Sequence, residues 1–119
     1  MAKLSAHNEM FRYFSVRYAG LIAVMDDGVV MRRTVYSNGW KILSRKKPGI
    51  PLQQWIESKK RQYDELEEWK RKTTKLPSEQ TLARWVTDCM CETPTGYEVE
   101  PDGAGPDGVP SWLILLRMI

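Results

Sequence analysis

With 119 residues, the chain is close to the usual size of one domain. Its 42% hydrophobic and 28% charged residues are typical of a folded protein and exclude a disordered one. The first five residues lack the apolar stretch of a signal peptide, and the longest apolar runs, 21–25 and 112–116, are too short to span a bilayer. We therefore expect a single domain over 1–119, cytoplasmic and without a membrane partner.

The net charge of +3 conceals a strong asymmetry along the chain. Residues 1–75 contain 16 Lys and Arg against 8 Asp and Glu, a net of +8. Residues 76–119 contain 2 against 7, a net of −5. This split predicts one basic face and one acidic face, and it bears on the choice of partner.

Residues 10–44 are rich in β-branched and aromatic side chains, which favour strands. Asp27-Gly28 and Asn38-Gly39 punctuate the stretch, and such pairs supply the positive φ of tight hairpins. The pattern predicts a β-meander with strands near 11–18, 21–25, 29–36 and 40–44. A partly helical first element is the alternative, because Met10, Phe11, Phe14 and Tyr18 also fit helical spacing.

Pro48 and Pro51 end the sheet, and a long amphipathic helix is expected to follow from Leu52 until about 72–75. Ser78 is the expected N-cap of a second helix. Its apolar side chains are Leu82, Trp85, Val86 and Cys89.

Residues 93–109 contain two Pro-Asp-Gly turns and predict a loop or a short hairpin. Residues 112–119 are apolar nearly all round, which favours a short buried helix over a strand. The predicted class is α+β, with a meander part at 1–50 packed against the long helix and a mainly helical part at 51–119. We expect one core to contain Trp55, Tyr63, Leu66, Leu82, Trp85, Val86, Trp112 and Leu113.

Catalytic groups are scarce in this sequence. His7 is the single histidine, and no glycine-rich phosphate loop is present. Cys89 and Cys91 stand too close for a disulfide and do not have the spacing of a zinc hook, so we expect reduced thiols. The acidic residues Glu98, Glu100, Asp102 and Asp107 do not fit the spacing of a calcium loop. We therefore expect no enzyme, cofactor, metal or small-molecule substrate.

A basic run is the strongest candidate contact surface. No acidic residue lies between Arg32 and Lys47. Cations on the predicted long helix have acidic neighbours at i, i+4, namely Glu57 with Arg61, Glu67 with Arg71 and Glu68 with Lys72. We therefore predict that nucleic acid or a host nucleoprotein complex contacts the unpaired run, and its residues are Arg32, Arg33, Lys41, Arg45, Lys46 and Lys47.

Residues 78–88 resemble the second helix of excisionase-type helix-turn-helix proteins, in which a Ser or Thr cap precedes Thr-Leu, a basic residue and Trp. This helix has one basic residue, Arg84, and two acidic residues, Glu79 and Asp88. A recognition helix is usually more basic.

The C-terminal third resembles a family of small, uncharacterised phage and plasmid proteins. The shared signature is Val-Glu-Pro-Asp-Gly at 99–103 and Pro-Ser-Trp-Leu at 110–113. Several family members have Cys or His at the positions of Cys91, Tyr97, Gly105, Asp107 and Val109, which implies a small zinc-binding loop in those relatives. Here only Cys91 is a thiol, with Asp107 as a weak ligand at best, so we expect no zinc.

Together these features predict a non-enzymatic binding protein of mobile-element origin, in the cytoplasm of a host cell. Its partner is expected to be nucleic acid or a nucleoprotein complex. The alternative is a phage accessory inhibitor or adaptor that acts by protein–protein contact on a host defence complex, with its acidic face docked on a basic groove.

Overall fold

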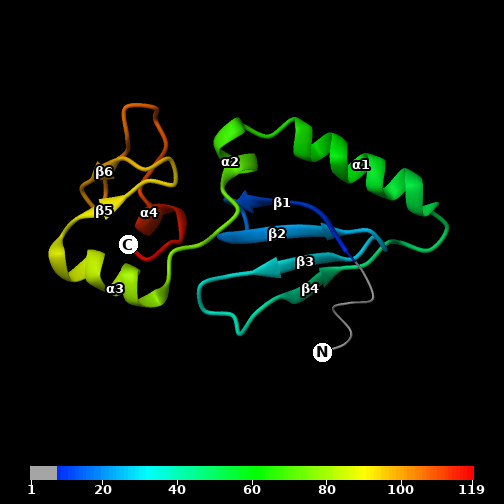
Figure 1. The fold of residues 1–119 in the computed structure, drawn as a ribbon, viewed down its shortest axis with the longest axis horizontal. Helices are drawn as coiled ribbons and strands as arrows, with labels where there is room; N and C mark the ends of the chain where they lie inside the picture. The colour runs from blue at the N-terminus through cyan, green and yellow to red at the C-terminus, as the bar shows by residue number, and fades with distance from the viewer. Residues whose placement is uncertain (1–7) are drawn as a thin grey trace.

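The protein forms two lobes, shown in Figure 1. Its structure is a computed structural model, which describes residues 8–119. The sheet lobe comprises residues 8–72, the C-terminal lobe comprises residues 79–119, and the connecting segment 73–78 passes between them. The molecule measures 50 × 32 × 18 Å, and the lobes lie side by side along its longest axis.

The sheet lobe contains an antiparallel meander of four strands in the order β1-β2-β3-β4. The strands are β1 Glu9–Ser15, β2 Gly20–Met25, β3 Val30–Arg33 and β4 Lys41–Ser44. The predicted meander is confirmed, and the helical alternative for the first element is wrong. Gly28 and Gly39 both have φ +88°, as the two predicted turns require.

Strand β2 is buried along almost its whole length because both faces of the sheet are covered there. On one face, Ile22 and Val24 pack with Trp55 of the following helix. On the opposite face, Leu21 packs with Phe14 and with side chains of the C-terminal lobe. Alternate residues of one strand therefore contribute to two separate clusters.

The predicted long helix is wrong in its extent. Helix α1 spans Leu52–Asp64, and a separate short helix α2 spans Glu68–Lys72. Trp55 anchors α1 on the sheet by donating its indole N–H to the Gly28 carbonyl at 2.8 Å. The break before α2 brings Trp69 to 6.1 Å from Phe14, measured between ring centroids.

The C-terminal lobe starts with α3 Glu79–Asp88, and its predicted N-cap is confirmed because the Ser78 hydroxyl accepts from the Thr81 amide. A two-stranded hairpin follows, β5 Cys91–Glu92 and β6 Glu98–Val99. A short helix, α4 Trp112–Leu115, follows, and its Trp112, Leu113 and Leu115 are buried. The predicted helix over 112–119 is therefore confirmed only for its first half, and Ile114 and Ile119 are exposed.

The single predicted core is wrong, because its buried members divide between two clusters, while Tyr63 and Leu66 are half-buried and belong to neither. Trp55 belongs to the cluster under α1, with Ile22, Val24 and Val30. The cluster that joins the lobes contains Phe14, Leu21, Leu82, Trp85, Cys91, Trp112, Leu113, Leu115 and Leu116. Val86 and Cys89, both predicted as apolar-face residues of the second helix, are exposed.

A polar contact also joins the two lobes. The Arg117 guanidinium donates to the Val16 and Arg17 carbonyls, at 3.1 and 2.9 Å. The turn between β1 and β2 is thereby held by the C-terminal lobe. Within residues 8–119, no helix has the length and apolar character needed to cross a membrane.

Candidate functional site

The two arginines of β3 lie on opposite faces of the sheet. Arg32 pairs with Ile22 and Lys41 across the strands and shares the face that α1 covers. Its guanidinium donates to the Tyr18 carbonyl at 3.1 Å and lies 5.5 Å from the centre of the Tyr18 ring. Arg33 pairs with Leu21 and is exposed on the other face. Strand alternation therefore separates two neighbouring residues of the predicted surface.

Arg45, Lys46 and Lys47 lie in the loop between β4 and α1. Lys46 donates its ammonium to the Ile50 carbonyl at 2.8 Å and to the Lys47 carbonyl at 3.2 Å, so it stabilises the loop. Arg45 and Lys47 are exposed, and neither forms an ion pair with any residue from 8 to 119. The six predicted residues thus form three groups on the sheet lobe and share no single face.

A groove of about 340 Å³ lies between α1 and the sheet, next to Arg32. Ile22, Val24, Val30 and Leu43 line its apolar part. Its polar lining residues are Tyr13, Arg17, Tyr18, Ser44, Lys59 and Gln62. We call this cavity the α1 groove. The sequence pattern does not reveal this groove, because it places Arg17 and Tyr18 at the end of a predicted strand and Lys59 on a predicted helix whose charges are largely paired.

The cations of the α1 groove lie against aromatic rings. The Arg17 guanidinium is 5.4 Å from the centre of the Tyr18 ring, and the Lys59 ammonium is 4.6 Å from that of Trp55. No acidic side chain lines the groove. Burial, with a smaller contribution from the nearby Tyr18, raises the pKa of the Tyr13 hydroxyl, which therefore remains protonated at neutral pH. The groove is thus basic and can donate hydrogen bonds.

A second cleft, of about 600 Å³, lies between the hairpin after β3 and the segment 74–79. Arg33 and Lys75 line it together with Glu79, so its charges have both signs. Arg12 also lines it, but its guanidinium binds the Glu9 carboxylate at 2.6 and 2.8 Å, and this contact raises the pKa of Arg12. The cleft is therefore less basic than its three lining cations would make it without these acidic partners.

The residues considered for metal or catalytic chemistry are scattered. His7 lies outside the described residues. Cys89 is exposed at the end of α3, whereas Cys91 is buried and its thiol contacts the Glu92 carbonyl. Across the part of the chain from 8 onward, no three His, Cys, Asp or Glu side chains gather closely enough to hold a metal ion.

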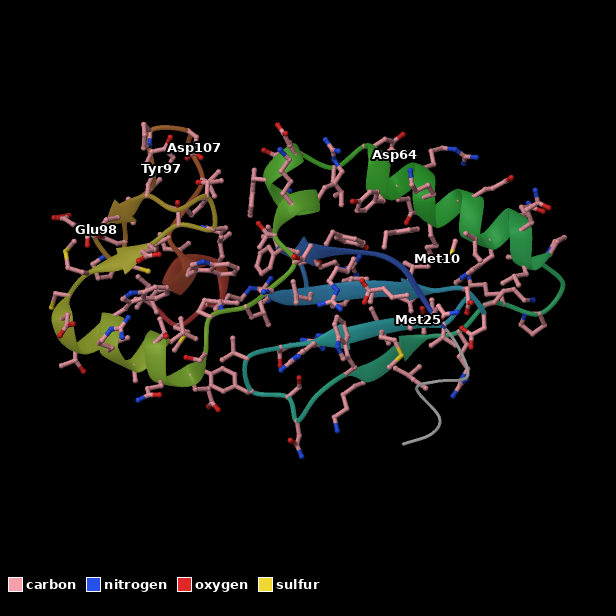
Figure 2. The ribbon with its side chains drawn as sticks, in the orientation of Figure 1. Met10, Met25, Asp64, Tyr97, Glu98 and Asp107 are labelled. Carbon is pink, nitrogen blue, oxygen red and sulfur yellow. The ribbon has the colours of Figure 1, made fainter. Side chains whose placement is uncertain are left out.

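The acidic residues of the C-terminal lobe are on its outer surface. Figure 2 shows Tyr97 and Asp107 near the tip of the loops and Glu98 at the outer edge of the lobe. Both predicted Pro-Asp-Gly turns form, with hydrogen bonds from Gly103 to Glu100 and from Gly108 to Gly105. The acidic surface is therefore carried by hydrogen-bonded turns.

No protein-family model, curated protein or solved structure matches the chain. The resemblance to phage and plasmid proteins therefore stays a prediction. In the helix that resembles a recognition helix, Arg84 is exposed together with Glu79 and Asp88, so the outer surface of α3 is not basic.

Proposed function

We propose that the protein is a non-enzymatic binding protein of mobile-element origin that contacts nucleic acid, alone or in a nucleoprotein complex, through its sheet lobe. The observation that carries this proposal is the separation of charge between the lobes. Over residues 8–72 of the sheet lobe there are 14 Lys and Arg against 8 Asp and Glu, a net charge of +6, and over residues 79–119 of the C-terminal lobe there are 2 against 7, a net charge of −5. A phosphate backbone is attracted to the first and repelled by the second.

Several cations of the sheet lobe are available for phosphate contacts. Ion pairs within residues 8–119 involve Arg12, Lys60, Lys70 and Lys72. Arg33, Lys41, Arg45 and Lys47 are exposed and have no such partner. Because these cations have no acidic partner to displace, a phosphate can contact them directly.

The test is the salt dependence of binding to fluorescent DNA and RNA oligonucleotides, measured by anisotropy between 50 and 200 mM salt. Arg45→Glu/Lys47→Glu reverses two exposed cations and should reduce the slope of log affinity against log salt by about two. Lys46 is left intact because its ammonium holds the loop.

Arg84→Glu is the matched control, since Arg84 is also exposed but lies on α3 of the acidic lobe. It should leave the slope unchanged. If the double variant binds with the affinity and slope of the wild type, or if the wild type binds no oligonucleotide at 50 mM salt, the proposal is wrong.

A second candidate function is supported by the acidic surface. Glu98 on β6 and Glu100, Asp102 and Asp107 on the loops that follow are exposed, where they could contact a basic groove of a host defence complex. The protein would then be an inhibitor or adaptor. A pull-down from host lysate with and without nuclease distinguishes the two, because partners lost after nuclease favour nucleic acid and partners retained favour the inhibitor.

A further inference from the structure

The α1 groove combines an apolar surface with unpartnered polar groups. Its volume of about 340 Å³ is near the lower end of the range for small-ligand pockets, about 300–1,000 Å³. The four aliphatic residues that line it come from three strands, β2, β3 and β4. Ile22, Val24 and Val30 are only 1–5% exposed and form the floor of the groove, so the surface open to a ligand comes from Leu43 and the polar lining residues, and a flat, partly apolar group of the size of one nucleotide suits it.

Around this surface, four polar side chains can form hydrogen bonds with the edge of such a group. They are Tyr13, Tyr18, Ser44 and Gln62. Within residues 8–119, the side-chain polar atoms of these four residues form no hydrogen bond. None of these atoms is fully buried, so each is accessible to solvent. Hydroxyl and amide groups donate and accept, as the edges of nucleic-acid bases require.

Two cations are placed to hold the phosphates on either side of the bound group. Arg17 lies in the turn between β1 and β2, and Lys59 lies on α1. The turn is held by Arg117 through the carbonyls of Val16 and Arg17. The Tyr18 amide also donates to the Ser15 hydroxyl at 3.2 Å. Because these contacts order the turn beforehand, little conformational entropy is lost on binding.

We propose that the α1 groove binds one unpaired base of a single-stranded nucleic acid, with Arg17 moving from the Tyr18 ring to one adjacent phosphate, Lys59 on the other, and the base stacking on the ring face of Tyr18 that Arg17 leaves. The inference rests on the proposed function and adds the class of nucleic acid. A base inside a duplex is stacked and paired on its Watson–Crick edge, so it presents neither its face nor that edge to the groove. Stacking tolerates any base, because every base has a π-face.

The experiment compares binding of a fluorescent 12-nucleotide single strand with binding of the same sequence as a duplex, at 100 mM salt, by anisotropy. The wild type should bind the single strand at least about tenfold more tightly than the duplex. Tyr18→Ala should weaken single-strand binding by about 5- to 150-fold, the range for loss of one stacked base, and leave duplex binding unchanged.

Tyr36→Ala is the matched control, since Tyr36 is 68% exposed in the turn after β3 and does not line the groove. It should bind both forms as the wild type does. Gln62→Ala is a second variant at an exposed position of α1, where the fold tolerates alanine. It should weaken single-strand binding by about 2- to 10-fold through the loss of a hydrogen bond.

The possible results separate the two proposals. If single strand and duplex bind equally, or if Tyr18→Ala and Gln62→Ala change single-strand binding no more than Tyr36→Ala does, the inference is wrong while the proposed function stands. If neither form binds at 50 mM salt, both are wrong.

Discussion

At the scale of single residues, Arg32 contacts both the ring and the backbone carbonyl of Tyr18. The Arg32 guanidinium lies over the Tyr18 ring and donates to the Tyr18 carbonyl. Its Nε is buried without an acceptor, and it is the one such side-chain atom within residues 8–119. An unpaired buried donor costs about 1–3 kcal/mol. The same position of Arg32 gives the two contacts that hold Tyr18 in place at the edge of the α1 groove.

Trp85 is the residue whose removal should destabilise the C-terminal lobe most clearly. It is buried in the cluster that joins the lobes. Trp85→Ala should lower the free energy of unfolding by about 3–5 kcal/mol, because it leaves a large cavity. Urea denaturation measures this change. Val86→Ala, at the neighbouring exposed position, should alter stability by less than about 0.5 kcal/mol. Equal effects of the two variants would contradict the assigned burial.

Gly28 and Gly39 have the same φ of +88° but different surroundings. A Cβ at Gly28 would lie 3.1 Å from Leu52 and 3.2 Å from Trp55, whereas a Cβ at Gly39 would meet nothing within 4 Å. Gly39→Ala should cost about 1–2 kcal/mol for the left-handed backbone alone. Gly28→Ala should cost at least about 1 kcal/mol more, from crowding. Thermal and urea unfolding of the pair would show whether α1 packs as closely on this turn as described.

At the scale of elements, the division between α1 and α2 shows packing overriding local preference. No Gly or Pro lies between Asp64 and Glu68, and helical periodicity continues through Leu66. Glu67 is extended, with ψ 147°, and the chain turns so that Trp69 reaches Phe14. Burying this large aromatic ring stabilises more than continuing a few helical hydrogen bonds. No local sequence signal marks such a break.

The end of α3 offers a stabilising substitution. Cys89 has φ +56° in the left-handed region and is exposed. Glycine adopts this conformation without the steric cost that a Cβ imposes. Cys89→Gly should raise the free energy of unfolding by about 0.5–1 kcal/mol. Cys91→Gly is the contrasting variant and should destabilise, because Cys91 is 1% exposed in the shared cluster. A loss of stability in Cys89→Gly would argue against the left-handed cap.

The loop before α4 should contribute a small pH dependence. The Thr95 hydroxyl donates to the Asp107 carboxylate at 2.7 Å, which lowers the pKa of Asp107, with the Val109 amide adding to the effect. A carboxylate with a lowered folded pKa stabilises the fold above its unfolded pKa of about 3.9, and this contribution is lost as pH falls through the folded pKa. Asp107→Asn should therefore melt slightly below the wild type at pH 7.

That difference should vanish as the pH falls below the folded pKa of Asp107. Thr95→Val removes the donor and should reproduce the effect at pH 7. Scanning calorimetry across this pH range provides the measurement. If Asp107→Asn melts with the wild type at pH 7, the hydrogen bond adds nothing to stability.

At the scale of the whole molecule, the lobes are joined by apolar packing and carry opposite charge. Phe14 and Leu21 of the sheet lobe pack with Leu82 and Leu113 of the C-terminal lobe. Phe14 also makes an edge-to-face contact with Trp112, with 5.3 Å between the ring centroids. Since both lobes contribute to one cluster, we expect them to unfold together.

Removal of metal ions tests whether the stability of the fold depends on zinc. We predict that the purified protein contains no stoichiometric zinc and that a chelator leaves its melting temperature unchanged. Cys91 is buried and its thiol contacts a backbone carbonyl, while Tyr97 and Gly105 supply no ligand side chain for zinc. Elemental analysis near one zinc per chain, or a melting temperature lowered by the chelator, would contradict the prediction.

Features that depend on a few neighbouring residues could be predicted from the amino-acid sequence alone. The α+β class, the hairpin at Gly28 and the Ser78 cap were all predictable, because positive φ and end caps act locally. The charge asymmetry was also visible, since it is a property of composition.

The packing of the whole chain sets where those features meet. It placed Arg32 and Arg33 on opposite faces, bent the chain before α2, and brought Arg17 and Tyr18 opposite Lys59. These outcomes depend on which surfaces are buried against each other across long stretches of chain. Such contacts are set by packing and not by local preference, so no pattern within one segment can reveal them.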